Sequence, residues 1–406
     1  MFKSKIHQWL LLILLGSTVY SSNIRAQWVE ASGSAEIRNG DKHEAKNKAV
    51  KNAVKEALMF AGASVSSVQE VTDGLLTQDN FKVSAHGSIQ QIELIDEHHS
   101  QGIISVTIRA DIVTSTNSAE EARCFSSEFR KSVAITQLSL NNREQAKIGS
   151  LYGIGKVFSQ RLADLMRKES DYVLARPWYQ QKINNQTSFE QYYDNDLKVI
   201  DTIGQSSESQ FVLLGQITDM SFGDQTSSDF AFWKDRAIER YFSVDFMLYN
   251  TSTKEQVYRE QFDAVGDWSF DPRRRVDIKG QKFWRSNYGG SITSVIEQVK
   301  MAVEQVVYCQ PLQGKIVRVD GNQIQFNLGA NHGVVKGQRF SIIHQSHFVN
   351  ENGKHLPRFV ISPYQVEVVD VYTKTAVANS INDELLGNIQ TTDHVILKQI
   401  EDVGFE

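Results

Sequence analysis

The sequence predicts a multidomain α+β and α/β protein, because three segments with different patterns follow one another along the chain. A small segment with one helix and several strands comes first, a longer segment of alternating helices and strands lies between two cysteines, and the last segment contains strands only. Hydrophobic residues make up 41% of the 406 residues and charged residues 22%, a composition that excludes disorder and a polytopic membrane protein. The expected segments are 1–26, 27–118, 119–311 and 312–406.

Residues 1–26 have the order of a secretory signal peptide. The first seven residues carry two lysines, an apolar run follows from Trp9 to Leu15, and a polar stretch ends at Ala26. The apolar run is much shorter than the roughly 20 residues that span a bilayer. We therefore expect cleavage between Ala26 and Gln27, with an uncleaved anchor as the alternative.

Charge and cysteine position indicate where the mature chain works. The full chain has 43 Lys+Arg and 48 Asp+Glu, a net charge of −5; loss of the leader removes three basic residues and no acid, so the mature charge is −8. An acidic chain gives no reason to expect nucleic acid as a partner. A lipid anchor needs a cysteine at the mature N-terminus, but the first cysteine is Cys124. The expected location is the bacterial periplasm, without a membrane anchor.

Cys124 and Cys309 are the only cysteines. An even number of cysteines in an oxidising compartment favours a disulfide, and two separate buried thiols are the alternative. A bridge over so long a loop is worth roughly 5 kcal/mol in the chain-entropy model, as an upper figure.

The first segment, 27–118, predicts a helix packed on a sheet. Asp41 and Glu44 are spaced as an N-terminal capping box, which opens a helix to about Ala61. Alanine recurs in it every fourth residue, and such a stripe lets a helix approach a sheet closely. The expected strands are 28–37, 81–95 and 102–113.

The middle segment, 119–311, predicts a mixed sheet with helices packed on it. Phe211 to Leu214 has the apolar character of a strand buried on both faces. The other expected strands lie around Val133, at 172–175, and in a hairpin of 241–249 and 256–265; the expected helices are 148–165 and 292–306.

The last segment, 312–406, predicts a small β-barrel of SH3 or OB type. Asp320-Gly-Asn separates the expected strands 315–319 and 323–328 and is a strong hairpin signal, and the second of these strands alternates between apolar and polar residues. Further short strands fit 338–344, 364–372, 374–378 and 394–400, which is typical of small barrels.

No motif in the chain nominates catalysis, a cofactor or a metal. His344, His347 and His355 lie close in sequence, but the first two point to opposite faces of a strand and no cysteine accompanies them. Gly153 and Gly155 resemble part of a dinucleotide-binding loop that lacks its third glycine. No nucleophile-elbow motif occurs. We therefore expect a protein that is not an enzyme.

One stretch has the composition of an interaction surface. Tryptophan and arginine are enriched in protein interface hot spots, and they gather near residues 268–285 with a smaller group near 233. The alternative is an insertion that only covers the sheet. The candidate interface residues are Trp233, Arg236, Trp268, Phe270, Arg273, Arg274, Arg275, Trp284 and Arg285.

The mature chain resembles the flagellar assembly protein T family (FlgT). The resemblance is carried by Trp28-Val-Glu-Ala-Ser-Gly-Ser-Ala with the alanine-striped helix after it, Phe211-Val-Leu-Leu-Gly-Gln-Ile, and Gly314-Lys-Ile-Val-Arg-Val-Asp-Gly. It implies a periplasmic ring component, the H ring, outside the LP ring of a sodium-driven polar flagellar motor. This ring would help the T-ring proteins MotX and MotY to assemble and hold stator units. The resemblance further implies a middle domain similar to the N-terminal domain of TolB, and an N-terminal domain that joins the basal body.

The residues alone leave other functions open. A TolB-like or curli-secretion-like envelope protein fits the middle segment alone. TolB itself carries a β-propeller, for which too few residues follow Cys309, and the curli secretion component needs the lipidated cysteine that is missing here. A secreted hydrolase would show a pocket with converging polar groups and perturbed carboxylates.

Overall fold

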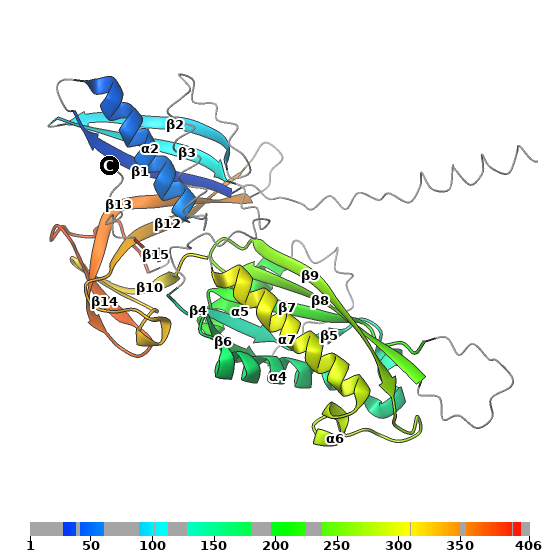
Figure 1. The fold of residues 1–406 in the computed structure, drawn as a ribbon. Helices are drawn as coiled ribbons and strands as arrows, with labels where there is room; N and C mark the ends of the chain where they lie inside the picture. Colours follow the sequence, from blue (N-terminus) through cyan, green and yellow to red (C-terminus); the bar gives the residue numbers. More distant parts are fainter. Residues whose placement is uncertain are drawn as a thin grey trace, which may run out of the picture.

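The computed structural model describes residues 27–37, 41–60, 89–100, 102–112, 128–179, 196–223, 238–308, 310–349, 355–391 and 393–398. The protein is a mixed α+β molecule with two sheets of nine and six strands (Figure 1). The described part contains no helix of sufficient length and hydropathy to cross a membrane. The molecule has three parts, which we name the N-terminal unit (27–112), the middle unit (128–308) and the C-terminal unit (310–398).

In the described part of the N-terminal unit one helix packs on three strands, as predicted, and the second strand continues to Ser100, beyond its predicted end at residue 95. Its elements are β1 (Gln27–Glu36), α2 (Lys42–Phe60), β2 (Ile89–Ser100) and β3 (Ile103–Ile112). The Asp41 carboxylate accepts a hydrogen bond from the Glu44 backbone N–H at 3.0 Å, so the predicted helix start is confirmed. The alanine stripe of α2 is buried, and it packs where β1 carries Gly33. A Cβ atom on Gly33 would lie 2.2 Å from the Ala49 carbonyl oxygen.

The middle unit is a mixed sheet between helices, as predicted. Its strands are β4 (Lys131–Thr136), β5 (Ser139–Leu140), β6 (Val173–Trp178), β7 (Phe211–Asp219), β8 (Ile238–Asn250) and β9 (Gln256–Trp268). Its helices are η1 (Arg143–Ala146), η2 (Ile148–Ser150), α4 (Ile154–Glu169), α5 (Asp196–Ser207), α6 (Gln281–Trp284) and α7 (Asn287–Tyr308). Strands β4, β6 and β7 are parallel, while β8 and β9 are antiparallel to their neighbours.

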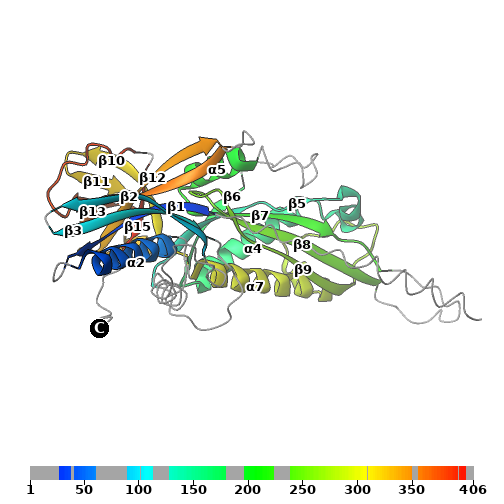
Figure 2. The same cartoon turned by 90° about the horizontal axis from the view of Figure 1, so that it is seen from above.

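Both faces of this sheet are covered. The larger core lies under α4 and α7, and a smaller one lies under α5 (Figure 2). The apolar run Phe211–Leu214 belongs to β7, whose side chains alternate between the two cores. The prediction that this strand is buried on both faces is therefore confirmed.

The described part of the C-terminal unit contains six strands and a short 3-10 helix. They are β10 (Gln313–Asp320), β11 (Gln323–Phe326), η4 (Ala330–His332), β12 (Arg339–Val349), β13 (His355–Val371), β14 (Ala376–Ser380) and β15 (His394–Leu397). Strands β10 and β11 form the predicted hairpin, with Gly321 at φ +65° in its turn. Strand pairing runs from β10 through β11, β14, β13, β12 and β15 and returns to β10.

The N-terminal and C-terminal units share one sheet. Strand β1 pairs in parallel with β13, with Val29 opposite Phe359, and the side chains of Ile343, Phe359, Ile361 and Ile396 complete the core under α2. Glu30, whose side chain is 4% exposed, accepts hydrogen bonds from Arg109 at 2.8 Å and from Arg358 at 2.5 Å. A buried carboxylate held by two arginines resists separation of its partners. Strand β1 is thus joined to β13, a strand more than 300 residues later in the sequence.

Lys131 is a fully buried lysine at the start of β4. Its Nζ donates to the carbonyl oxygen of Tyr308, at the end of α7, at 3.1 Å. Burial lowers the pKa of Lys131 to about 7, because a charged ammonium is poorly solvated in the core.

This lysine predicts a pH dependence of stability. Between pH 7 and pH 10 the unfolded chain binds a proton at Lys131 that the folded chain lacks, so the free energy of unfolding should rise with pH by up to about 1.4 kcal/mol per pH unit. Urea unfolding at pH 7, 8 and 9 measures the slope. Lys131→Met should flatten it, and the same change at exposed Lys336 should not. An equal slope in Lys131→Met and wild type would contradict this assignment.

Candidate functional site

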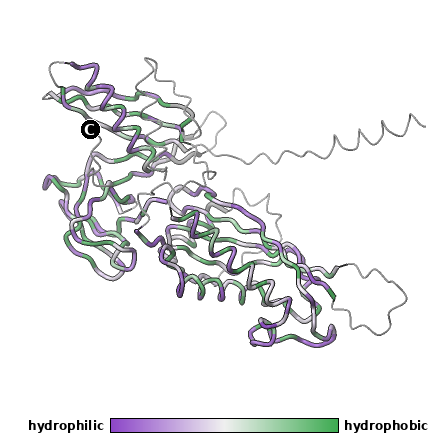
Figure 3. The backbone as a smooth tube through the Cα atoms, in the orientation of Figure 1, coloured by the Kyte–Doolittle hydropathy of each residue, from purple (hydrophilic) through white to green (hydrophobic). Residues whose placement is uncertain are grey.

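The predicted interface segment forms the free end of the middle unit. Residues 269–286, between β9 and α7 and including α6, are here named the distal tip. The tip lies at the end of the middle unit farthest from the other two units (Figure 1). Most of its residues are hydrophilic (Figure 3), and neither of the other units lies over it (Figure 1).

Two aromatic residues of the predicted interface, Trp268 and Trp284, form the base of the tip. Trp268 is 4% exposed and Trp284 8%, so neither ring lies at the surface that the sequence pattern indicated. Trp268 contacts Phe270 at a centroid distance of 5.1 Å and Tyr288 at 5.6 Å. Large rings gain most by leaving water, and they fill the space between the end of the sheet and α7. For these aromatics, the alternative of an insertion that covers the sheet describes the structure better.

Arg240, on β8, is the central residue of this base. Its side chain is fully buried and donates three hydrogen bonds to carbonyl oxygens, of Met220 at 3.1 Å, Ile148 at 3.2 Å and Gln145 at 2.6 Å. The guanidinium also lies over the rings of Phe222, Trp268 and Tyr288, at 4.7, 4.5 and 5.4 Å. Burial lowers the pKa of Arg240, but a guanidinium remains charged in proteins. One cation therefore holds η1, η2 and the end of β7 against the aromatic base.

The loop of the tip is fixed to this base by hydrogen bonds to backbone carbonyl oxygens. Val276 N–H donates to the carbonyl oxygen of Gly149 at 2.9 Å, and the Trp284 indole donates to that of Ile278 at 2.8 Å. Gly149 has φ +79°, and a Cβ there would lie 2.7 Å from the Trp268 ring. Only glycine allows this close approach.

The arginines of the predicted interface lie at the surface. Arg273, Arg274, Arg275 and Arg285 are all exposed, and the Arg274 side chain is 84% exposed. The structure thus divides the predicted residues into a buried aromatic base and an exposed basic surface. Phe270, partly buried, lies between the two.

Two residues next to the tip were not part of the sequence prediction. Arg161, on α4, stacks over the Trp284 ring at 4.1 Å, and Tyr152 is 44% exposed beside Arg143, whose guanidinium lies 5.6 Å from its ring. These residues lie more than 100 positions before the tip, so composition within one window could not find them. In the sequence, Arg240 belongs to the smaller aromatic and basic group near residue 233. No local sequence pattern indicates that its side chain is buried.

Several predicted site residues lie outside the described residues. Trp233 and Arg236 are among them, as are both cysteines, Cys124 and Cys309, and Ala26 of the expected cleavage site. Gln27, the first residue after that site, begins β1. The disulfide and the cleavage position therefore remain predictions.

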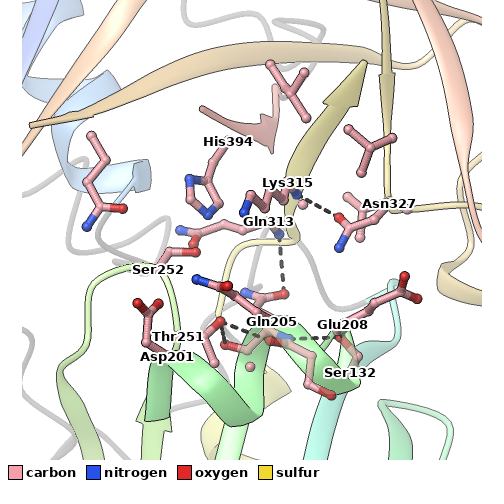
Figure 4. A pocket seen from close by; sticks show the side chains of 18 of the residues that line it. Ser132, Asp201, Gln205, Glu208, Thr251, Ser252, Gln313, Lys315, Asn327 and His394 are labelled. Atoms are coloured by element: carbon pink, nitrogen blue, oxygen red, sulfur yellow. Dashed lines mark hydrogen bonds between the residues drawn. The ribbon is translucent and has the colours of Figure 1, made fainter. Parts of the chain in front are cut away.

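A polar cleft separates the middle and C-terminal units. It encloses about 540 Å³ between α5 and the 251–254 turn on one side and β10 with His394 on the other (Figure 4). Across the junction the Gln210 side chain donates to the carbonyl oxygen of Pro311 at 2.7 Å and accepts from Gln313 N–H at 3.3 Å. Asp201, on the middle-unit wall, is paired with Lys254 at 3.6 Å. The cleft has the hydrogen-bonded, polar lining of a domain junction, unlike the mostly apolar lining of small-molecule pockets.

The histidines considered as metal ligands are described in the structure only in part. His344 Nδ1 lies 2.7 Å from the buried carboxylate of Asp393, and the side chains of His347 and His355 lie outside the described part. Burial and Lys315 together lower the pKa of His394 to about 4. Within the described part of the chain, no three His, Cys, Asp or Glu side chains form a group that could hold a metal ion.

Solved structures that resemble parts of this chain do so distantly. The hypothetical protein CT253 of Chlamydia trachomatis matches with 13% identity and a TM-score of 0.33, over 44% of this chain and 98% of its own. PelC of Paraburkholderia phytofirmans, solved as a dodecamer, matches with 14% identity and a TM-score of 0.25, over 44% and 89%. TolB of Acinetobacter baumannii matches with 11% identity and a TM-score of 0.20, over 63% and 48%. No curated protein matches the sequence.

Family models cover most of the chain in three consecutive pieces. The N-terminal domain of flagellar assembly protein T matches residues 27–114, its middle domain residues 122–278 and its C-terminal domain residues 321–397. The three matches occur in the same order as the three units of the structure. The chain belongs to the flagellar assembly protein T family.

Proposed function

We propose that this protein is a non-enzymatic component of the H ring, which surrounds the LP ring of the flagellar basal body in the periplasm. In this role it supports assembly of the T-ring proteins MotX and MotY, and through them the stator. The observation that carries the proposal is the match of all three family domains, in order, at residues 27–114, 122–278 and 321–397. The family is a flagellar assembly family and not a known enzyme family.

The architecture supports a role as a rigid adaptor. The β1–β13 pairing and the hydrogen bonds from Arg109 and Arg358 to Glu30 join the N-terminal unit to the C-terminal unit. The hydrogen bonds of the Gln210 side chain join the C-terminal unit to the middle unit. A protein whose units are fixed to one another presents several surfaces at set distances. Several weak contacts made by one such subunit raise each other's effective concentration, which favours a stable ring.

Deletion of the gene in its native host tests the proposal. Basal bodies purified from the deletion strain, and from the same strain carrying the wild-type gene, are compared by electron microscopy and by their content of MotX and MotY. We expect the deletion to remove a ring on the outer-membrane side together with both T-ring proteins and to impair swimming, and the wild-type gene to restore all three. Intact rings and normal swimming in the deletion strain would refute the proposal and favour the TolB-like or curli-secretion-like alternative.

A further inference from the structure

The geometry points to the distal tip as a preformed docking site for an acidic protein surface. The carboxylates of the partner would be bound by Arg273, Arg274, Arg275 and Arg285. This inference rests on the proposed function and deepens it, since it names the chemistry of one partner surface.

The charge of the tip is opposite to that of the chain. Residues 269–286 contain six Lys or Arg and two Asp, a net charge of +4 in a protein whose net charge is −5. Both acids are used to shape the loop: Asp271 accepts from Arg273 N–H at 2.9 Å and Asp277 from Lys279 N–H at 3.0 Å. Arg274 lies 3.5 Å from Asp271, but a pair this exposed is worth little. The guanidinium groups are therefore available to a partner.

The arginines are presented by a rigid base. The loop that carries them is hydrogen-bonded to Gly149, and its aromatic residues pack around Arg240. An exposed charged loop normally loses conformational entropy on binding. Here the backbone is already held in place, so only the arginine side chains need to be ordered.

The buried aromatics decide which kind of partner fits. Single-stranded nucleic acid needs exposed rings for base stacking, and membrane surfaces need exposed tryptophan, phenylalanine or leucine to enter the headgroup layer. In the described structure Trp268, Phe283 and Trp284 are all buried, and none of the exposed large apolar side chains belongs to residues 269–286. The exposed ring beside the tip, that of Tyr152, has the Arg143 guanidinium 5.6 Å from its centroid. The exposed groups are mainly guanidinium forks, which bind carboxylates with two parallel hydrogen bonds. An acidic protein surface fits this arrangement best.

Charge reversal tests the site in the purified mature chain. Poly-L-glutamate serves as the carboxylate probe, with phosphatidylglycerol vesicles and a single-stranded oligonucleotide as competing probes. The variant Arg273→Glu/Arg274→Glu/Arg275→Glu should lose about tenfold or more of its affinity for poly-L-glutamate. The control Arg318→Glu/Lys336→Glu/Lys374→Glu makes the same charge change on the exposed surface of the C-terminal unit and should lose less than about twofold. All six residues are exposed, so both variants should melt as the wild type does.

The outcomes separate this inference from the proposed function. Equal losses in the two variants would overturn the tip as a specific site, and tighter wild-type binding to vesicles or to the oligonucleotide would overturn the acidic protein partner. In the deletion strain, the tip variant should be recovered on basal bodies in reduced amount while the control variant is recovered normally. Normal recovery of the tip variant would overturn the inference and leave the proposed function intact, whereas absence of the wild-type chain from basal bodies would overturn the proposed function itself.

Discussion

Replacing Arg240 by alanine is expected to lower the free energy of unfolding of the middle unit by about 3–5 kcal/mol. The change removes three hydrogen bonds and leaves the carbonyl oxygens of Gln145, Ile148 and Met220 without this donor. It also removes the cation that lies between the rings of Phe222, Trp268 and Tyr288 and leaves a cavity there. Urea unfolding followed by circular dichroism measures the effect.

Two further variants control this experiment. Arg240→Lys keeps the charge but cannot donate in three directions from one plane, so it should fall between wild type and alanine. Arg318→Ala removes an exposed arginine whose pair with Asp320 is at the surface and should change the free energy of unfolding by no more than about 0.5 kcal/mol. A loss below about 1 kcal/mol for Arg240→Ala would show that the base of the tip does not depend on this residue.

Replacing Gly33 by valine is expected to be the most damaging change in the N-terminal unit. A Cβ at this position would lie 2.2 Å from the Ala49 carbonyl oxygen and 2.4 Å from the Ala53 backbone nitrogen. Both atoms belong to the backbone of α2, so the whole helix must move away from β1. Overpacking costs typically 1–3 kcal/mol, and the lost contacts between helix and sheet add to it, so we expect about 3 kcal/mol or more.

The neighbouring residue supplies the control for this change. Ser34→Val places the same side chain on the same strand, at an exposed position on the opposite face, and should change the free energy of unfolding by about 0.5 kcal/mol or less. Hydrogen exchange of α2 amides should increase in Gly33→Val and stay at the wild-type level in Ser34→Val. Unchanged protection in Gly33→Val would contradict the close packing of α2 on β1.

The elements that the sequence predicted well are those with a strong local pattern. The alanine stripe and the Asp41 cap define α2 to within about one residue at each end, and the Asp320-Gly-Asn turn lies where the β10–β11 hairpin reverses. The predicted helix at 148–165 is displaced: α4 begins at Ile154 because Gly149 adopts a positive φ and the chain forms η2 first. The apolar stripe in the sequence runs on through Gly149, but the chain turns at this residue. The turn brings Gly149 against the Trp268 ring.

The features that sequence reasoning missed depend on residues far apart in the chain. Helix α5 (Asp196–Ser207), which packs Ile200 and Ile203 on the second face of the middle sheet, was not predicted. The pairing of β1 with β13 joins segments more than 300 residues apart, which no local period reports. For the candidate site, composition located the arginines and aromatics of the tip but could not tell which were buried. That distinction depends on Arg240 and Gly149, which reach the tip only in the folded chain.

Locating the protein in the cell tests most directly whether it is a structural part of the basal body. A version with a gold-binding tag after residue 406 is expressed from the native locus, and purified basal bodies are imaged by electron microscopy. We expect gold on a ring outside the LP ring, in several copies per basal body, with swimming retained. Tagged protein found only in the soluble periplasmic fraction of swimming cells, with none on basal bodies, would contradict a structural role.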